Sequence, residues 1–159
     1  MMTTRRVVLL LRVLLVLAFL AVLVLQLMSV PGMLDYRAEQ NPDLGWRRWV
    51  LLGILEAELV CAQVVIVCTW MLLGMVRQDR IFTDQAMRWV DGIVGALVVG
   101  WLVWAGLSLL IVLDADDPGT PLLLAILLLA GAVFLLLMIV MRALLKQATT
   151  LRADLEGVI

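Results

Sequence analysis

The stretch RQDRIFTDQAMRW, residues 77–89, is a charged segment near the middle of a chain that is otherwise mostly apolar. Long apolar runs flank it on both sides, so it predicts a short loop that turns into a helix. Thr83 is suited to cap that helix, because its hydroxyl can accept an early backbone N–H. Asp84 places a negative charge in the first turn and stands four residues before Arg88, the favourable order for an ion pair. The stretch therefore predicts a helix start at a membrane surface.

The composition places the chain among membrane proteins. Of its 159 residues, 65% are hydrophobic and 16% are charged, whereas a soluble domain is about 45–50% apolar. There is no histidine, which removes the commonest metal ligand and the commonest general base near neutral pH. Cys61 and Cys68 are about 10.5 Å apart along a helix, too far for a disulfide. We expect no metal, no cofactor and no disulfide.

Four apolar runs are long enough to cross a bilayer, which takes about 20 helical residues. The expected spans are residues 7–28, 50–75, 89–113 and 122–141. Pro31 and Gly32 are expected to end the first span, and residues 33–48 to form a polar loop. The predicted fold class is all-α, an integral membrane bundle of four transmembrane helices that forms a single domain over residues 1–159.

Residues 142–159 continue the helical period beyond the fourth span. Their apolar positions recur at steps of three or four: Leu144, Ala148, Leu151 and Leu155. This pattern predicts an amphipathic extension of the fourth helix on the cytoplasmic side.

The basic residues predict the orientation of the chain. Four spans put both termini on one side, together with the middle loop. Nine basic residues lie there: Arg5, Arg6, Arg12, Arg77, Arg80, Arg88, Arg142, Lys146 and Arg152. The other side has three: Arg37, Arg47 and Arg48. Since cytoplasmic loops carry the excess of Lys and Arg, we expect both termini in the cytoplasm.

Small residues at helical spacing are candidate contacts between spans, because helices in lipid associate through close packing. The two stripes are Gly53, Ala57 and Cys61 in the second span and Gly92, Ala96 and Gly100 in the third. We expect both stripes to be helix contacts, and the two could contact each other. Small residues are also common in membrane helices that make no such contact.

The second span carries the candidate polar site of the membrane interior: Glu56, Glu58 and Gln63. An ionised carboxylate there costs at least a few kcal/mol, so each must be protonated, paired or hydrated. The two glutamates are two residues apart and point to different sides, whereas Glu56 and Gln63 share a face. One interpretation is a proton- or cation-coupled site, as in small multidrug exporters with one membrane glutamate. The other places both glutamates near the outer headgroups, paired with Arg47 or Arg48.

Two further charges lie near the ends of spans. Arg12 stands within the first two turns of the first span and can reach back to the headgroups. Asp91 lies close to the cytoplasmic boundary of the third span and can pair with Arg88 three residues earlier.

Residues 72–96, LLGMVRQDRIFTDQAMRWVDGIVGA, resemble the central signature of a bacterial family of small four-span membrane proteins, domain of unknown function 2975. The tail LRADLEGVI at 151–159 is similar to that family's C-terminal end, and CAQVVIVCTWMLLGMVR at 61–77 is similar to its actinobacterial members. The positions that match the family signature are Arg80, Ile81, Phe82, Thr83 and Arg88. The resemblance implies a four-helix fold in the bacterial inner membrane, with no established activity.

Two functions compete on this sequence. The first is a non-enzymatic regulatory or interaction protein whose docking face comprises the 77–89 loop, with Arg80, Phe82, Thr83 and Arg88, and the C-terminal helix. Family members are often encoded beside a small helix-turn-helix regulator, which is therefore a candidate partner. The second is a small transporter or ligand-binding bundle that uses Glu56, Glu58 and Gln63.

Other roles are disfavoured by what the sequence lacks. Without histidine, a close cysteine pair or clustered inward carboxylates, we expect no enzyme. The cytoplasmic charges are sparse and mixed, so no direct contact with nucleic acid is expected. The expected partners are the lipid bilayer, the regulator or another membrane protein, and further copies of the chain.

Overall fold

The structure is a computed structural model that describes residues 2–40, 45–76, 83–113 and 117–156, and its regular elements there are all helical. They are α1 (Met2–Val24), the π-helical turn η1 (Leu25–Ser29), α2 (Val30–Gln40), α3 (Arg47–Val76), α4 (Asp84–Leu113) and α5 (Gly119–Glu156). Four helices are long and apolar enough to cross a membrane, the first running through α1, η1 and α2. The prediction of an all-α chain with four candidate spans is confirmed.

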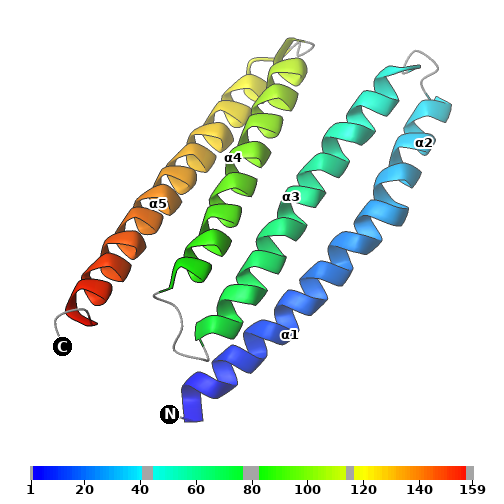
Figure 1. The fold of residues 1–159 in the computed structure, drawn as a ribbon. Coiled ribbons are helices and arrows are strands. Elements are labelled where there is room, and N and C mark those ends of the chain that lie inside the picture. Colours follow the sequence, from blue (N-terminus) through cyan, green and yellow to red (C-terminus); the bar gives the residue numbers. More distant parts are fainter. Residues whose placement is uncertain (1, 41–44, 77–82, 114–116, 157–159) are drawn as a thin grey trace.

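The helices run alternately in opposite directions and lie in an open row (Figure 1). α3 packs on α1 and on α4, and α4 packs on α5. α1 and α5 stand at the two edges and share no extensive contact. An open row suits a bilayer, because each helix satisfies its own backbone hydrogen bonds and lipid can cover the faces that remain.

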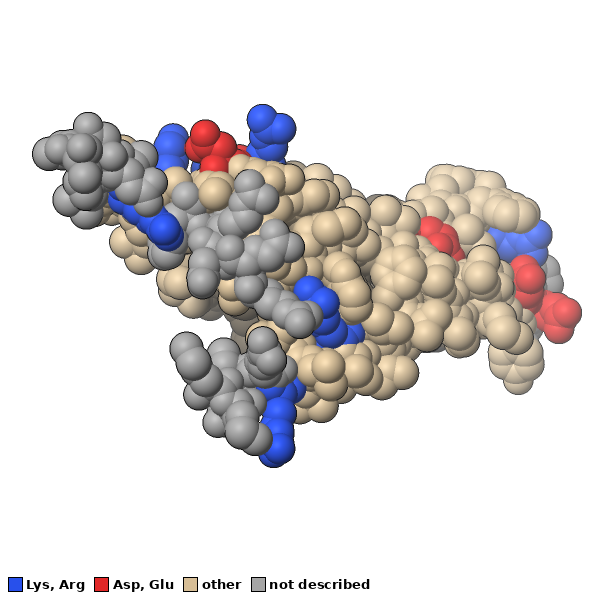
Figure 2. Space-filling view, turned by 60° about the horizontal axis from the view of Figure 1, so that its bottom comes forward, with Lys and Arg blue, Asp and Glu red and all other residues tan. Residues whose placement is uncertain are grey.

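Charged side chains lie mainly toward the two ends of the molecule, with a wide band of other residues between them (Figure 2). Large apolar side chains are exposed along this band, among them Leu20, Val99, Leu129 and Leu137. In water such a surface would drive aggregation, whereas in a bilayer it is the surface that faces the acyl chains.

The first span differs from its prediction. Pro31 and Gly32 do not end the helix, which continues as α2 to Gln40. The predicted polar loop at 33–48 is therefore wrong for residues 33–40, and for 47–48, where α3 begins. Residues 41–44 of that loop lie outside the described residues. Proline inside a helix lacks a hydrogen-bond donor and its ring clashes with the preceding turn. The wider π-helical turn η1 ends at Ser29, two residues before Pro31, and so relieves this conflict in the turn that precedes the proline. At the same end, Arg48 pairs with Asp35 of α2 at 3.6 Å.

α4 and α5 both begin at side-chain caps. Thr83 accepts a hydrogen bond from the backbone N–H of Ala86 at 3.4 Å through its hydroxyl, as the sequence predicts. Asp117 accepts two bonds from Thr120, one from the backbone N–H and one from the hydroxyl, each at 2.8 Å. These bonds, the backbone bond foremost, lower the pKa of the Asp117 carboxyl. From this cap α5 runs without a break to Glu156, and the described residues show no separate amphipathic C-terminal helix.

One tryptophan ties α4 to α5. The indole N–H of Trp101 donates a hydrogen bond to the backbone carbonyl of Leu128 at 3.1 Å. Its ring lies against Gly131, where an added Cβ would stand 3.0 Å from Trp101 Cδ1 and 3.3 Å from Nε1. The hydrogen bond fixes the indole, so the ring cannot swing away from a larger residue without losing that bond.

The contact predicts that Gly131→Ala destabilises the protein although alanine favours a helix over glycine. Overpacking costs about 1–3 kcal/mol, which exceeds the gain of about 1 kcal/mol in helix propensity. We expect a lower free energy of unfolding, measured by reversible denaturation with sodium dodecyl sulfate in mixed micelles. Gly95→Ala is the matched control, because a Cβ at Gly95 meets nothing within 4 Å. Equal stability of the two variants would contradict this account of the α4–α5 contact.

Candidate functional site: a groove at Glu58

Small residues bring α3 and α4 together. A Cβ at Gly100 of α4 would stand 3.3 Å from Glu58 Oε2 and 3.6 Å from Cys61 Cβ. One at Gly92 would stand 3.0 Å from the Sγ of Cys68. α3 therefore lies so close to α4 that a Cβ at either glycine would make a tight contact with a side chain of α3.

The other members of the two stripes lie as follows. Ala96 and Cys61 line one common groove between the helices. Ala57 is half-buried, and Gly53 is exposed with nothing within 4 Å of an added Cβ. At Gly53 the second-span stripe therefore does not face a neighbouring helix at close range among the described residues.

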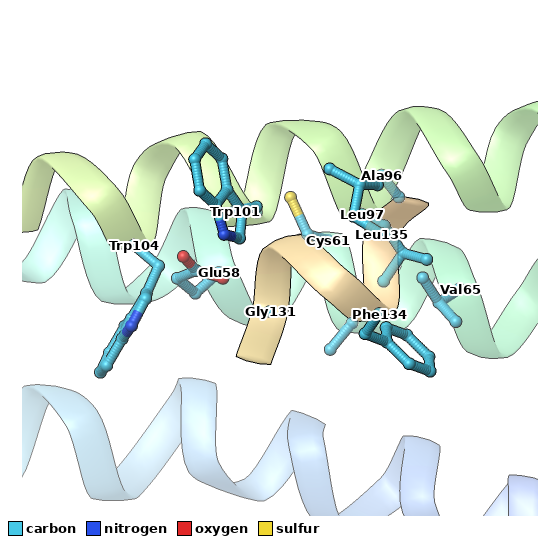
Figure 3. A pocket seen from close by; sticks show the side chains of 12 residues that line it. Glu58, Cys61, Val65, Ala96, Leu97, Trp101, Trp104, Gly131, Phe134 and Leu135 are labelled. Carbon is cyan, nitrogen blue, oxygen red and sulfur yellow. The ribbon is translucent and has the colours of Figure 1, made fainter. Parts of the chain in front are cut away.

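The side chain of Glu58 lies in a groove of about 310 Å³ where α3, α4 and α5 meet. We call this hollow the Glu58 groove. Its lining is Glu58, Cys61, Ala62, Val65, Ala96, Leu97, Gly100, Trp101, Trp104, Gly131, Phe134 and Leu135. Glu58 is the only ionisable carboxylate among them. Figure 3 shows its carboxylate between the indoles of Trp101 and Trp104.

Glu58 is placed deep within the candidate span. At about 1.5 Å per residue it stands about 16 Å from Arg47 and about 27 Å from Val76 along α3. Its Oε1 atom is buried and has no hydrogen-bond partner among the described residues. An ionised carboxylate with one buried oxygen unpaired is costly within a membrane span, so a proton on Glu58 or a cation in the groove would stabilise it.

The structure separates the three polar residues that the sequence groups in the second span. Gln63 faces the first helix and donates a hydrogen bond from its amide to the side-chain oxygen of Gln26 at 2.6 Å. Gln26 belongs to the π-helical turn η1. Glu56 is half-buried and, like Gln63, does not line the Glu58 groove. Arg48, one of the two partners considered for these glutamates, instead contacts Asp35.

Near the start of α4, an ion pair joins α4 to α5. Arg142 donates a hydrogen bond from its Nε to the carboxylate of Asp91. The sequence predicts Arg88 as the partner of Asp91, so this prediction is wrong. Both partners are partly exposed. Arg88 is exposed, and Thr83 caps α4. The remaining docking residues predicted in this region, Arg80 and Phe82, lie outside the described residues.

The described residues contain no cluster of three His, Cys, Asp or Glu side chains that could hold a metal ion. The groove therefore offers one carboxylate, a thiol and two indoles. This set can attract a positive charge and an apolar body, but it has no paired acid and base for proton transfer chemistry.

Sequence reasoning missed the residues of α4 and α5 that line the groove around Glu58. Trp101 and Trp104 are three residues apart, so they share a helix face, and both lie well inside a span rather than at its ends. Gly131 is the only glycine of the fourth span. These signals were present, but only the packing of α5 on α4 connects them to Glu58.

The comparisons with known proteins bear on the family alone. The family described as "Protein of unknown function (DUF2975)" matches residues 32–159, which leaves out α1 and η1. No curated protein and no solved structure matches the chain. The match gives no support for an actinobacterial origin, but it confirms the resemblance carried by the central stretch and the tail. The chain belongs to the DUF2975 family of proteins of unknown function.

Proposed function

We propose that this chain is a non-enzymatic binding protein of the bacterial cytoplasmic membrane, with both termini in the cytoplasm. Two observations support the orientation. The alternating helices bring the start of α1, the end of α3, the start of α4 and the end of α5 to one end of the row. In the sequence, the termini and the middle loop carry nine basic residues, against three in the first loop on the other side.

The proposed activity is the binding of a small lipophilic cation in the Glu58 groove. The observation that carries it is the buried Oε1 of Glu58, which has no hydrogen-bond partner among the described residues and lies in an otherwise apolar lining. A cation in the groove would pair with this carboxylate and remove the cost of burying it alone.

The lining favours a particular class of ligand. Trp101 and Trp104 line the groove beside the carboxylate, and aromatic rings attract quaternary or protonated amines. Phe134 and Leu135 provide apolar surface for the body of the molecule. The volume of about 310 Å³ lies at the lower end of the range for small-molecule sites. A small amine with an aromatic or branched alkyl group fits these conditions.

A proton competes with such a cation for the same carboxylate. Binding should therefore weaken as the pH falls, because protonated Glu58 no longer attracts a positive charge. The same competition would let the site exchange a cation for a proton, which is the chemistry required of a small transporter. A binding protein and a transporter would both have to bind the cation first.

Cytoplasmic docking is a second candidate function, favoured by the length of α5. Arg142 is hydrogen-bonded to Asp91, and α5 continues for about 21 Å beyond it. This last part of the helix offers a surface for a partner. Leu144 and Leu151 are exposed there, 53% and 64%, on the predicted amphipathic extension. The proposed partner is a small helix-turn-helix regulator or another membrane protein, contacted together with the 77–89 loop.

The groove predicts that Glu58→Gln weakens the binding of benzyltrimethylammonium by at least about tenfold, because the amide cannot neutralise the cation. Equilibrium dialysis of the detergent-solubilised full chain measures this, with neopentylbenzene as the uncharged isostere. The isostere should bind wild type and variant alike. Wild-type affinity for the cation should also fall as the pH is lowered, and that of Glu58→Gln should not.

Glu56→Gln is the matched control, since Glu56 lies two residues away on the same helix and does not line the groove. It should bind the cation as wild type does. An equal loss in the two variants, or no preference for the cation over its isostere, would show that the groove is not a cation site.

The docking function predicts that Leu151→Ala reduces retention of the proposed partner, a purified small helix-turn-helix regulator, because part of the apolar contact is lost. Leu122→Ala is the control, with a leucine of matched exposure, 65%, at the opposite end of α5. A pull-down from detergent compares the variants. Equal retention by wild type, Leu151→Ala and Leu122→Ala would count against docking on α5.

A further inference from the structure

A second hollow lies on the other side of α3, between α3 and α1. It has a volume of about 220 Å³, and its lining is Leu15, Val16, Phe19, Leu20, Ile66, Val67 and Trp70. We call it the Arg12 groove, after the charge at its end. The lining carries no ionisable group, so the hollow itself can accommodate only an apolar body.

Arg12 stands at the end of this groove that is nearer to the start of α1. Its guanidinium lies over the ring of Trp70, 5.4 Å from the ring centre. A Cβ at Gly74 would stand 3.7 Å from Arg12 Nη2, so the side chain runs along α3 toward the end of that helix. The Nε atom is buried and has no hydrogen-bond partner among the described residues.

Along the membrane normal, the charge of Arg12 lies nearer to the end of the row than the apolar hollow does. Arg12 precedes Leu15 by about 4.5 Å of helix rise and Leu20 by about 12 Å. On α3, Gly74 lies about 3 Å from Val76, where the helix ends, whereas Ile66 lies about 15 Å from it. The charge is thus toward the polar end of the row, and the apolar groove leads from it into the membrane.

We propose that this is a binding site for one anionic phospholipid, whose phosphate contacts Arg12 and whose acyl chain fills the groove. A guanidinium has several donors and binds phosphate oxygens in pairs. Trp70 holds the guanidinium by a cation–π contact and also lines the groove, so it joins the two parts of the site. The order of charge and groove matches the order of headgroup and tail.

The chemistry of the hollow favours an acyl chain over a peptide segment. Its described lining is entirely apolar. An acyl chain has no polar group that such a lining would leave without a hydrogen bond, whereas a peptide backbone has two in each residue. The site is independent of the Glu58 groove, which lies against the α4 side of α3 and carries the opposite charge.

Native mass spectrometry of the full chain tests the proposal, after exchange into micelles that contain equal amounts of phosphatidylglycerol and phosphatidylcholine with the same acyl chains. Wild type should retain one phosphatidylglycerol, in about tenfold preference over phosphatidylcholine. Arg12→Leu should lose this preference, and Arg12→Lys should keep part of it because the charge remains. Val67→Trp, which fills the groove and leaves the charge, should retain less of both lipids.

Arg6→Leu is the matched control, because it removes the same charge from the same helix end outside the groove. Circular dichroism establishes that every variant is folded. Three results would overturn the proposal: no lipid preference in wild type, an equal loss in Arg6→Leu and Arg12→Leu, or undiminished retention in Val67→Trp. Competition by millimolar inorganic phosphate would likewise overturn it, since it would assign the charge to a free anion rather than a lipid.

Discussion

The close approach of α3 and α4 at Gly100 is the contact on which the rest of the structure depends. In a bilayer, apolar surface gains little by leaving lipid for protein, so helices hold together where their backbones can come near each other. Gly100 allows this, and by doing so it places Glu58 against α4. A Cβ at position 100 would stand 3.3 Å from Glu58 Oε2, so a larger residue there would require the carboxylate to shift within the groove that α5 covers in part.

Much of the fold could be predicted from the sequence, because four apolar runs and a helix cap at Thr83 are local signals. The first span was the exception, since the effect of Pro31 depends on the π-helical turn before it, which leaves no clear pattern in sequence. The polar site was only partly predictable. Spacing shows which side of its own helix Glu58 occupies, but not that Gln63 meets Gln26 or that Trp101 stands beside Glu58.

α3 is the element that the two proposed sites share. One side carries a carboxylate against α4, and the other carries Trp70 against α1, with a guanidinium stacked on it. The two charges are of opposite sign and stand about 18 Å or more apart along the helix axis, judged from Glu58 to Trp70. Ligands of opposite charge can thus be bound in one small protein without neutralising each other.

The π-helical turn at Leu25–Ser29 has a consequence for how the first helix tolerates change in length. Such a turn is equivalent to one residue inserted into an α-helix, and each residue of α-helix turns the chain by about 100°. Deleting one residue between 25 and 29 would restore a regular helix and rotate α2 about its axis relative to α1. Asp35 would then leave Arg48, while Arg12 would keep its place on Trp70. The turn therefore fixes the rotation of α2 relative to α1, so that each of the two helices presents its own contact residue to α3.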